Sequence, residues 1–163
     1  MPFEIERKFL VLGSEWRASS LSSVHIRQAY LAVGGNASIR VRIKDNQEAR
    51  LTIKSKGAGL RRLELEYPIP VIEAEALIAL RQNSVIQKVR HIVPWAGCQW
   101  EVDVFEGDNA GLIIAEIELA DEQQVIELPP WLGPEVTSDD KYYNSALTIR
   151  PFSTWASEQQ VAV

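Results

Sequence analysis

Regular alternation of polar and apolar residues runs through most of this sequence and constrains its fold more than any other feature. Alternation at a period of two places successive side chains on opposite faces of a β-strand. The sequence therefore predicts eight strands, at residues 3–12, 24–33, 37–44, 49–56, 62–69, 85–93, 99–105 and 112–119.

Short runs of turn-forming residues separate several of these strands. Gly34-Gly35-Asn36, Asp45-Asn46-Gln47, Gly57-Ala58-Gly59 and Ala96-Gly97 each join two predicted neighbours. Connections this short form antiparallel hairpins, whereas parallel strands need a crossover of a dozen or more residues. The sequence therefore predicts antiparallel pairing and disfavours parallel βαβ packing.

Helical periodicity is confined to two segments. Residues 71–82 carry apolar side chains at helical spacing, after Pro68 and Pro70, which end the preceding strand. We expect this helix to cross one end of the fold. A shorter helix is predicted at 140–148. The fold class is thus α+β, mainly β, with a few flanking helices.

The charged residues of the predicted strands occur as pairs of like sign on one face. Alternation alone is also compatible with an ordinary solvent-exposed face. A solvated surface, however, usually mixes the two signs, and neighbouring like charges repel unless a ligand bridges them. The acidic pairs are Glu4 and Glu6, Glu64 and Glu66, Glu101 and Asp103, and Glu116 and Glu118; the basic pairs are Arg40 and Arg42, Lys54 and Lys56, and Lys88 and Arg90.

These pairs suit a ligand that carries charges of both signs. Carboxylate pairs can share a hard divalent cation, and basic pairs can share a phosphate group. A closed eight-stranded antiparallel barrel would enclose the charged face, leave no exposed strand edge and hold one small ligand. The apolar faces would then need cover from outside, which we expect from the two helices and the five Trp residues.

Composition and length exclude several other classes of protein. A net charge of −5 argues against general binding of nucleic acid or an anionic membrane. No apolar run approaches the ~18 residues that span a bilayer, and no signal-peptide pattern is present, so we expect a cytoplasmic protein. Cys98 is the single cysteine and cannot form an internal disulfide. No linker divides the chain, which predicts one domain over 1–163, with its core at about 1–150 and a loosely ordered tail at 151–163.

The same charged residues resemble a known family. Glu4-Ile5-Glu6-Arg7-Lys8 is similar to the ExExK signature of the CYTH superfamily, the triphosphate tunnel metalloenzymes, and the resemblance covers about residues 1–150. The later strands repeat the family pattern in order, at Arg40-Val41-Arg42, Thr52-Ile53-Lys54, Glu64-Leu65-Glu66, Lys88-Val89-Arg90, Glu101-Val102-Asp103 and Glu116-Ile117-Glu118, and residues 140–147 resemble the closing segment of small bacterial members.

The resemblance implies an eight-stranded tunnel that hydrolyses or cyclises triphosphate compounds with Mg²⁺ or Mn²⁺. It implies metal ligation by Glu4, Glu6, Glu116 and Glu118, and triphosphate binding by Lys8, Arg40, Arg42, Lys54, Lys88 and Arg90. It further implies catalytic or orienting roles for Lys8, Tyr30, Glu64, Glu66, Glu101 and Asp103. Lys56 is expected outside the substrate cage, and Lys141 is expected to approach it.

The expected reaction is cleavage of a terminal phosphoanhydride by metal-activated water. Inorganic tripolyphosphate is the favoured substrate, because the chain is small and few aromatic residues could stack a base. Thiamine triphosphate, nucleoside triphosphates and cyclisation of ATP remain alternatives. A non-catalytic polyphosphate- or nucleotide-binding module would not need the eight carboxylates, and a lipocalin-like carrier would need an apolar lumen.

Overall fold

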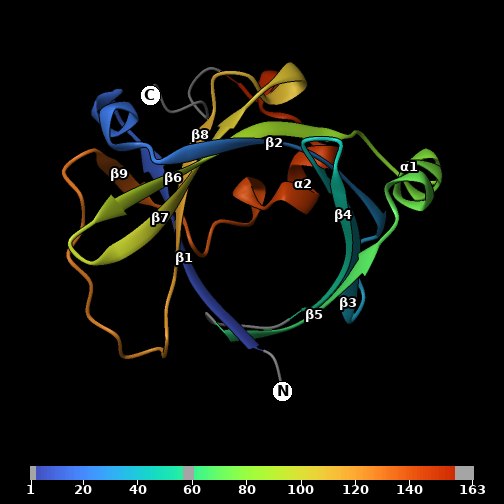
Figure 1. Cartoon of the computed structure of the whole chain (residues 1–163), viewed down its shortest axis with the longest axis horizontal. Helices are drawn as coiled ribbons and strands as arrows, with labels where there is room; N and C mark the ends of the chain where they lie inside the picture. Colours follow the sequence, from blue (N-terminus) through green and yellow to red (C-terminus); the bar gives the residue numbers. More distant parts are fainter. Residues whose placement is uncertain (1–2, 57–60, 157–163) are drawn as a thin grey trace.

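The computed structural model describes residues 3–56 and 61–156 and contains a closed antiparallel barrel (Figure 1). The sheet order is β5-β4-β3-β2-β6-β7-β8-β1, and β1 returns to pair with β5. The predicted eight-stranded barrel is thereby confirmed. Its strands are β1 (Phe3–Val11), β2 (Ser22–Ala32), β3 (Ala37–Lys44), β4 (Glu48–Ser55), β5 (Arg61–Ile69), β6 (Ile86–Trp95), β7 (Cys98–Phe105) and β8 (Ile113–Glu118).

Two of the predicted turns have the backbone that tight hairpins require. Asp45 and Asn46, between β3 and β4, have φ values of 50° and 56°. Ala96 and Gly97, between β6 and β7, have φ values of 48° and 79°. Two successive positive φ values define a type I′ turn, whose twist matches that of the strands it joins. The predicted turn at Gly57-Ala58-Gly59 lies outside the described residues.

A ninth strand, β9 (Leu132–Glu135), was not predicted and pairs with the end of β1. β1 pairs with β5 through residues 3–5 and with β9 through residues 9–11, so β9 continues the pairing after β5 ends. The approach is close, because a Cβ atom on Gly133 would lie 3.1 Å from the Leu12 side chain and 3.2 Å from the Leu10 carbonyl oxygen. Four residues that include Gly133 and Pro134 offer no alternation from which a strand could be predicted.

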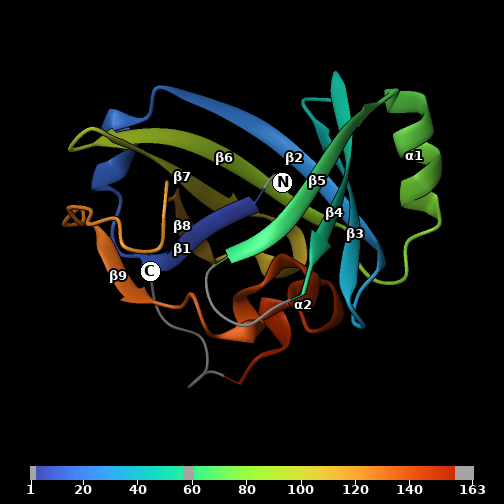
Figure 2. The ribbon, with the colours of Figure 1, turned by 90° about the horizontal axis from the view of Figure 1, so that it is seen from below.

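Helix α1 (Val71–Ala79) lies against the outer wall of the barrel and not across one end, so that expectation was wrong (Figures 1 and 2). Its buried residues Ala74 and Ile78 pack against Ala29, Val41 and Ile43, the apolar outward-facing side chains of β2 and β3. Burial of these side chains favours the wall over the open end, where the lumen is charged.

Tryptophans cover another part of the outer wall. Trp16 lies in the 3₁₀ helix η1 (Glu15–Ser19), and Trp131 precedes β9; both join a buried cluster with Phe9 and Trp100. The Trp100 ring contacts Phe9 and Trp131 edge to face, with ring centroids 5.7 and 6.0 Å apart. This cluster provides the cover that the outward apolar face of β1, β7 and β8 requires.

The C-terminal segment closes one end of the barrel. Helix α2 (Asn144–Ile149) follows the 3₁₀ helix η3 (Asp140–Tyr142) and lies at that end (Figures 1 and 2). It was expected to cover the outside, but it packs instead on apolar residues one pleat beyond the charged ones. This cluster comprises Leu10, Ile86, Phe105, Leu112, Ile114, Val136, Tyr142, Leu147, Phe152 and Trp155.

The remaining short helices are η2 (Gly107–Asn109) and η4 (Phe152–Thr154). Among the described helices, none has the length and apolar character needed to cross a membrane.

Candidate active site in the barrel lumen

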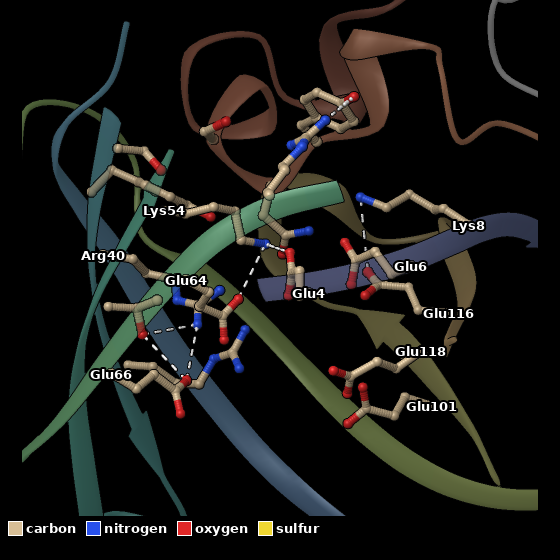
Figure 3. Close-up of a pocket in the computed structure, with 18 of the residues that line it drawn as sticks. Glu4, Glu6, Lys8, Arg40, Lys54, Glu64, Glu66, Glu101, Glu116 and Glu118 are labelled. Carbon is tan, nitrogen blue, oxygen red and sulfur yellow. Dashed lines mark hydrogen bonds and ion pairs between the residues drawn. The ribbon is translucent and has the colours of Figure 1, made fainter. Parts of the chain in front are cut away.

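The lumen is divided into a basic half and an acidic half. Lumen-facing cations lie mainly on β4, β3 and β6, and carboxylates lie on β7, β8, β1 and β5. The carboxylate-bearing strands are contiguous in the barrel, and among the cation-bearing strands only β2 intervenes, between β3 and β6. Charge pairs of the same sign that are far apart in the sequence therefore lie next to one another in the barrel. In Figure 3, Glu6, Glu116, Glu118 and Glu101 gather on one side of the cavity with Lys8, and Arg40 and Lys54 lie on the other with Glu64 and Glu66.

A cavity of about 270 Å³ occupies the lumen. Charged residues from strands that are far apart in the sequence line it, so the charged face of the sheet points inward. The chain therefore does not form the apolar lumen of a lipocalin-like carrier. Asp103 is the predicted site residue that does not line this cavity. The predicted site residues that do line it are Glu4, Glu6, Lys8, Tyr30, Arg40, Arg42, Lys54, Glu64, Glu66, Lys88, Arg90, Glu101, Glu116 and Glu118.

Several lining residues were not predicted. Arg62 lies one pleat before Glu64, and Lys44 lies one pleat beyond Arg42, so extending the period-two rule by two residues would have found both. Tyr143, Asn144 and Ser145 enter from the C-terminal segment, where no local pattern indicates a direction. The complete set of additional lining residues is Ser38, Lys44, Thr52, Arg62, Tyr143, Asn144 and Ser145.

Two other lysines lie away from this cavity. Lys56 was expected outside the cage and lines a neighbouring cavity of about 350 Å³, to which Arg62 and Tyr143 also contribute. Lys141 was expected to approach the cage. Its Nζ atom instead lies 5.2 and 4.9 Å from the ring centroids of Tyr142 and Trp155, and it does not line the lumen.

Ion pairs link the two halves where they meet on β4 and β5. Lys54 pairs with Glu4 and also lies 3.6 Å from a carboxylate oxygen of Glu64. Arg40 lies 3.7 Å from Glu66, and its Nη2 donates to Thr52 Oγ1 at 3.1 Å. The carboxylates of β5 therefore hold cations of the basic half in place.

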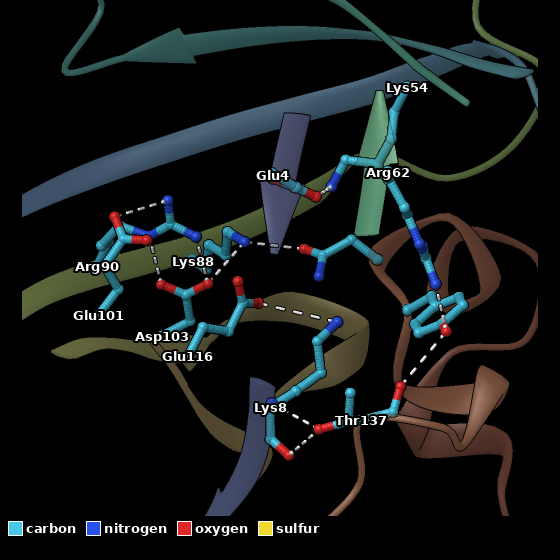
Figure 4. A network of polar contacts seen from close by, with 12 residues as sticks. Glu4, Lys8, Lys54, Arg62, Lys88, Arg90, Glu101, Asp103, Glu116 and Thr137 are labelled. Atoms are coloured by element: carbon cyan, nitrogen blue, oxygen red, sulfur yellow. Dashed lines mark hydrogen bonds and ion pairs between the residues drawn. The ribbon is translucent and has the colours of Figure 1, made fainter. Parts of the chain in front are cut away.

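A fully buried carboxylate links the halves at the β6–β7 boundary (Figure 4). Asp103 Oδ1 and Oδ2 accept from Arg90 Nε and Nη2 at 2.8 and 2.9 Å, and Lys88 Nζ lies 2.7 Å from Oδ2. Burial opposes ionisation, but the charges of Arg90 and Lys88 hold the pKa of Asp103 well below its usual range. Burial lowers the pKa of Lys88 to about 7, although Asp103 opposes this shift. Asp103 is thus placed to orient two cations and not to touch a ligand in the cavity.

The carboxylates of β1 and β8 are crowded. Glu6 lies directly opposite Glu118, and Lys8 directly opposite Glu116. Burial, reinforced by the charge of Glu116, raises the pKa of Glu6 to about 7. Burial also raises the pKa of Glu4 to about 7, with a contribution from Glu64. Burial opposes ionisation of Glu116, but the charges of Lys8, Arg90 and Lys88 together lower its pKa to about 2.

A divalent cation fits the chemistry of this donor set. In the arrangement described for residues 3–56 and 61–156, no three Asp, Glu, His or Cys side chains are close enough together to hold a metal ion. Burial raises the pKa of Glu4 and of Glu6, so a nearby cation would favour the ionised form of both carboxylates. Oxygen ligands of this kind are those that Mg²⁺ and Mn²⁺ prefer.

Fold and site together define an antiparallel β-barrel protein whose lumen cavity is lined by cationic side chains and by carboxylates. The chain matches the model of the CYTH domain over residues 2–149. It therefore belongs to the CYTH family, which confirms the resemblance seen in the sequence.

Relatives and solved structures agree with this assignment. The inorganic triphosphatase of Acetivibrio thermocellus is 45% identical over 153 residues, covering 93% of this chain and 97% of that protein. The inorganic triphosphatase of Nitrosomonas europaea is 37% identical over 150 residues, covering 90% and 97%. A crystal structure of an inorganic triphosphatase is similar with a TM-score of 0.67 and 34% identity, covering 91% of this chain and 96% of that chain.

Proposed function

We propose that this protein is a metal-dependent hydrolase of inorganic tripolyphosphate. The lumen cavity carries the proposal, because its cations lie mainly on β3, β4 and β6, here called the basic wall, and its carboxylates lie on β7, β8, β1 and β5, the acidic wall. A triphosphate needs the first wall, and the divalent ion that neutralises it needs the second. The inorganic triphosphatases that resemble this chain over more than 90% of their length support the choice of substrate.

The basic wall would bind and orient the phosphate chain. Arginine offers a planar fork of donors at constant charge, which suits Arg40, Arg42 and Arg90, whereas a lysine ammonium acts as a point charge. The carboxylates of Glu64, Glu66, Glu101 and Asp103 would keep these cations aimed at the substrate. Tyr30, which lies opposite Arg40 on the neighbouring strand, would complete the wall. The proposed phosphate-binding residues are Arg40, Arg42, Lys54, Lys88 and Arg90 of the basic wall, together with Lys8, which lies on β1 opposite Glu116.

The acidic wall would hold Mg²⁺ or Mn²⁺ through Glu4, Glu6, Glu116 and Glu118. When bound, the ion supplies positive charge to the phosphate oxygens and lowers the pKa of a bound water molecule. The oxygen of water would form a bond to the terminal phosphorus as the bridging P–O bond breaks, and the water proton would pass to a product oxygen or to solvent, giving orthophosphate and pyrophosphate. In phosphoryl transfer the protein contributes mainly positioning and electrostatic stabilisation, so no covalent nucleophile on the chain is required.

We further propose that the protein acts in the cytoplasm, with a small-molecule triphosphate as its partner and without binding nucleic acid or membranes. We treat the chain as one CYTH-type unit with its core at about 1–150 and its tail at 151–163.

Phosphate release from a panel of substrates tests the proposal. Tripolyphosphate, ATP and thiamine triphosphate are each incubated with Mg²⁺, with Mn²⁺ or with EDTA. We expect turnover of tripolyphosphate to exceed that of the two organic substrates at least about tenfold, and EDTA to abolish it because the acidic wall then lacks its cation.

Two other results would contradict this reading. Tripolyphosphate that binds in the presence of metal without phosphate release would identify a binding module. Formation of a cyclic nucleotide from ATP, with little tripolyphosphate hydrolysis, would identify a cyclase.

A further inference from the structure

A chain of hydrogen bonds connects the closing segment to two cations of the basic wall. Arg42 Nε donates to Gln28 Oε1 at 2.7 Å, and Gln28 Nε2 donates to Asn144 Oδ1 at 3.0 Å. Lys88 Nζ donates to the same Asn144 oxygen at 2.9 Å. Gln28 is completely buried, and Lys88 and Arg42 are 1% and 9% exposed.

Arg42 and Lys88, at the two ends of this hydrogen-bond series, determine which side-chain atoms of Gln28 and Asn144 donate and which accept. Arginine and lysine side chains are donors only, so each must meet an oxygen. Arg42 therefore directs the Gln28 oxygen toward itself, which leaves the Gln28 amide nitrogen to face Asn144. Asn144 receives donors from both Gln28 and Lys88, so its side-chain oxygen must be the atom that faces them.

The Asn144 amide nitrogen is consequently left over as a donor. Asn144 lines the lumen cavity, and no hydrogen bond from its Nδ2 is formed within residues 3–56 and 61–156. Lys88 contacts the Asn144 side chain directly and Arg42 is linked to it through Gln28, and both cations are proposed to bind phosphate. An amide donor linked to two such cations is complementary to a phosphate oxygen and to no cation.

We propose that Asn144 is a further substrate-binding residue, which donates from Nδ2 to an oxygen of the triphosphate at the α2 end of the cavity, and that Gln28 is the residue that positions it. This inference rests on the proposed function, because it names a contact to the same substrate. Through it the C-terminal segment, which closes the barrel, also contributes to substrate recognition.

Two substitutions that add the same negative charge to the cavity, Asn144→Asp and Ser145→Asp, distinguish loss of the amide donor from the effect of charge alone. Asn144→Asp keeps an oxygen for Gln28 and Lys88 but replaces the donor that faces phosphate by an acceptor. Ser145→Asp adds the same charge at the next lining residue and leaves the Asn144 amide intact. Binding of tripolyphosphate, measured by calorimetry in EDTA, is expected to weaken about 10- to 100-fold in Asn144→Asp. In Ser145→Asp we expect a clearly smaller loss, and in Asn144→Asp a melting temperature like that of the wild type.

A direct readout uses the wild-type protein. The side-chain amide resonances of Asn144, assigned by triple-resonance NMR, are expected to move downfield when tripolyphosphate is added, while those of the exposed Asn83 stay in place. Unmoved Asn144 resonances, or equal losses of binding in Asn144→Asp and Ser145→Asp, would overturn the proposal. Wild-type protein that neither binds nor hydrolyses tripolyphosphate would instead refute the proposed function itself.

Discussion

Replacing Asp103 by asparagine is expected to lower the free energy of unfolding by about 3–5 kcal/mol. Asp103 is 1% exposed and is the shared partner of Arg90 and Lys88. Removing its charge leaves the buried Lys88 without a counter-ion and Arg90 with only the partly exposed Glu101, and breaking a buried ion pair in this way is strongly destabilising. Urea denaturation of the two proteins at neutral pH measures the difference.

Glu101→Gln is the matched control for this experiment. Glu101 also contacts Arg90, at 3.2 Å, but its side chain is 41% exposed, so solvent screens the pair. We expect a loss below about 1 kcal/mol. If Asp103→Asn destabilised the protein no more than Glu101→Gln, the account of Asp103 as the buried anchor of the basic wall would be wrong.

The effect of Asp103→Asn should also depend on pH. The pKa of Asp103 is lowered in the folded protein, so its charge contributes stability that is fully present above the ordinary pKa of 3.8. That contribution is lost as the pH falls below this value toward the folded-state pKa. The difference in stability between the wild type and Asp103→Asn is therefore expected to shrink on acidification.

Glu6→Gln is expected to reduce tripolyphosphate turnover about 100-fold or more while making the protein more stable. Glu6 lies opposite Glu118 in the sheet, and its pKa is raised mainly by burial, with contributions from the charges of Glu116 and Glu4. An uncharged side chain of the same shape relieves the repulsion but removes a ligand of the catalytic cation. Initial rates with saturating Mg²⁺ and melting curves in EDTA measure the two effects.

We expect the melting temperature of Glu6→Gln in EDTA to rise by about 2–4 °C, corresponding to roughly 1 kcal/mol. Glu135→Gln serves as the control, because Glu135 pairs with Arg7 at 2.7 Å and does not line the lumen cavity. Its turnover should stay within about twofold of the wild type. Full activity in Glu6→Gln would show that the acidic wall does not hold the catalytic ion.

The barrel could be predicted from the sequence because alternation is a local property. The alternation within each strand shows which residues share a face, and the hairpin turns determine which strands pair with each other. The like sign of each charge pair then indicated an enclosed face. For Glu6, Arg40 and Glu118, parity placed the side chain on the charged face, and the like sign of each pair, together with the family resemblance, placed that face in the lumen.

Depth along the lumen could not be predicted in the same way. Glu101 and Asp103 have the same parity, yet Glu101 lines the cavity and Asp103 is buried behind Arg90 and Lys88. Ile114 shares its face with Glu116 but belongs to the apolar cluster beneath α2. These differences depend on where the C-terminal segment packs, and contacts between residues so distant in sequence leave no periodic signal.

A crystal structure of the protein with tripolyphosphate and Mn²⁺ tests the central claim most directly, because anomalous scattering identifies the metal. The account predicts a manganese peak bound by carboxylates of β1 and β8, and phosphate groups in contact with Arg40 and Arg42 on the opposite wall. Tripolyphosphate bound on the outer surface or only in the neighbouring cavity beside Lys56, with no metal in the lumen, would contradict it.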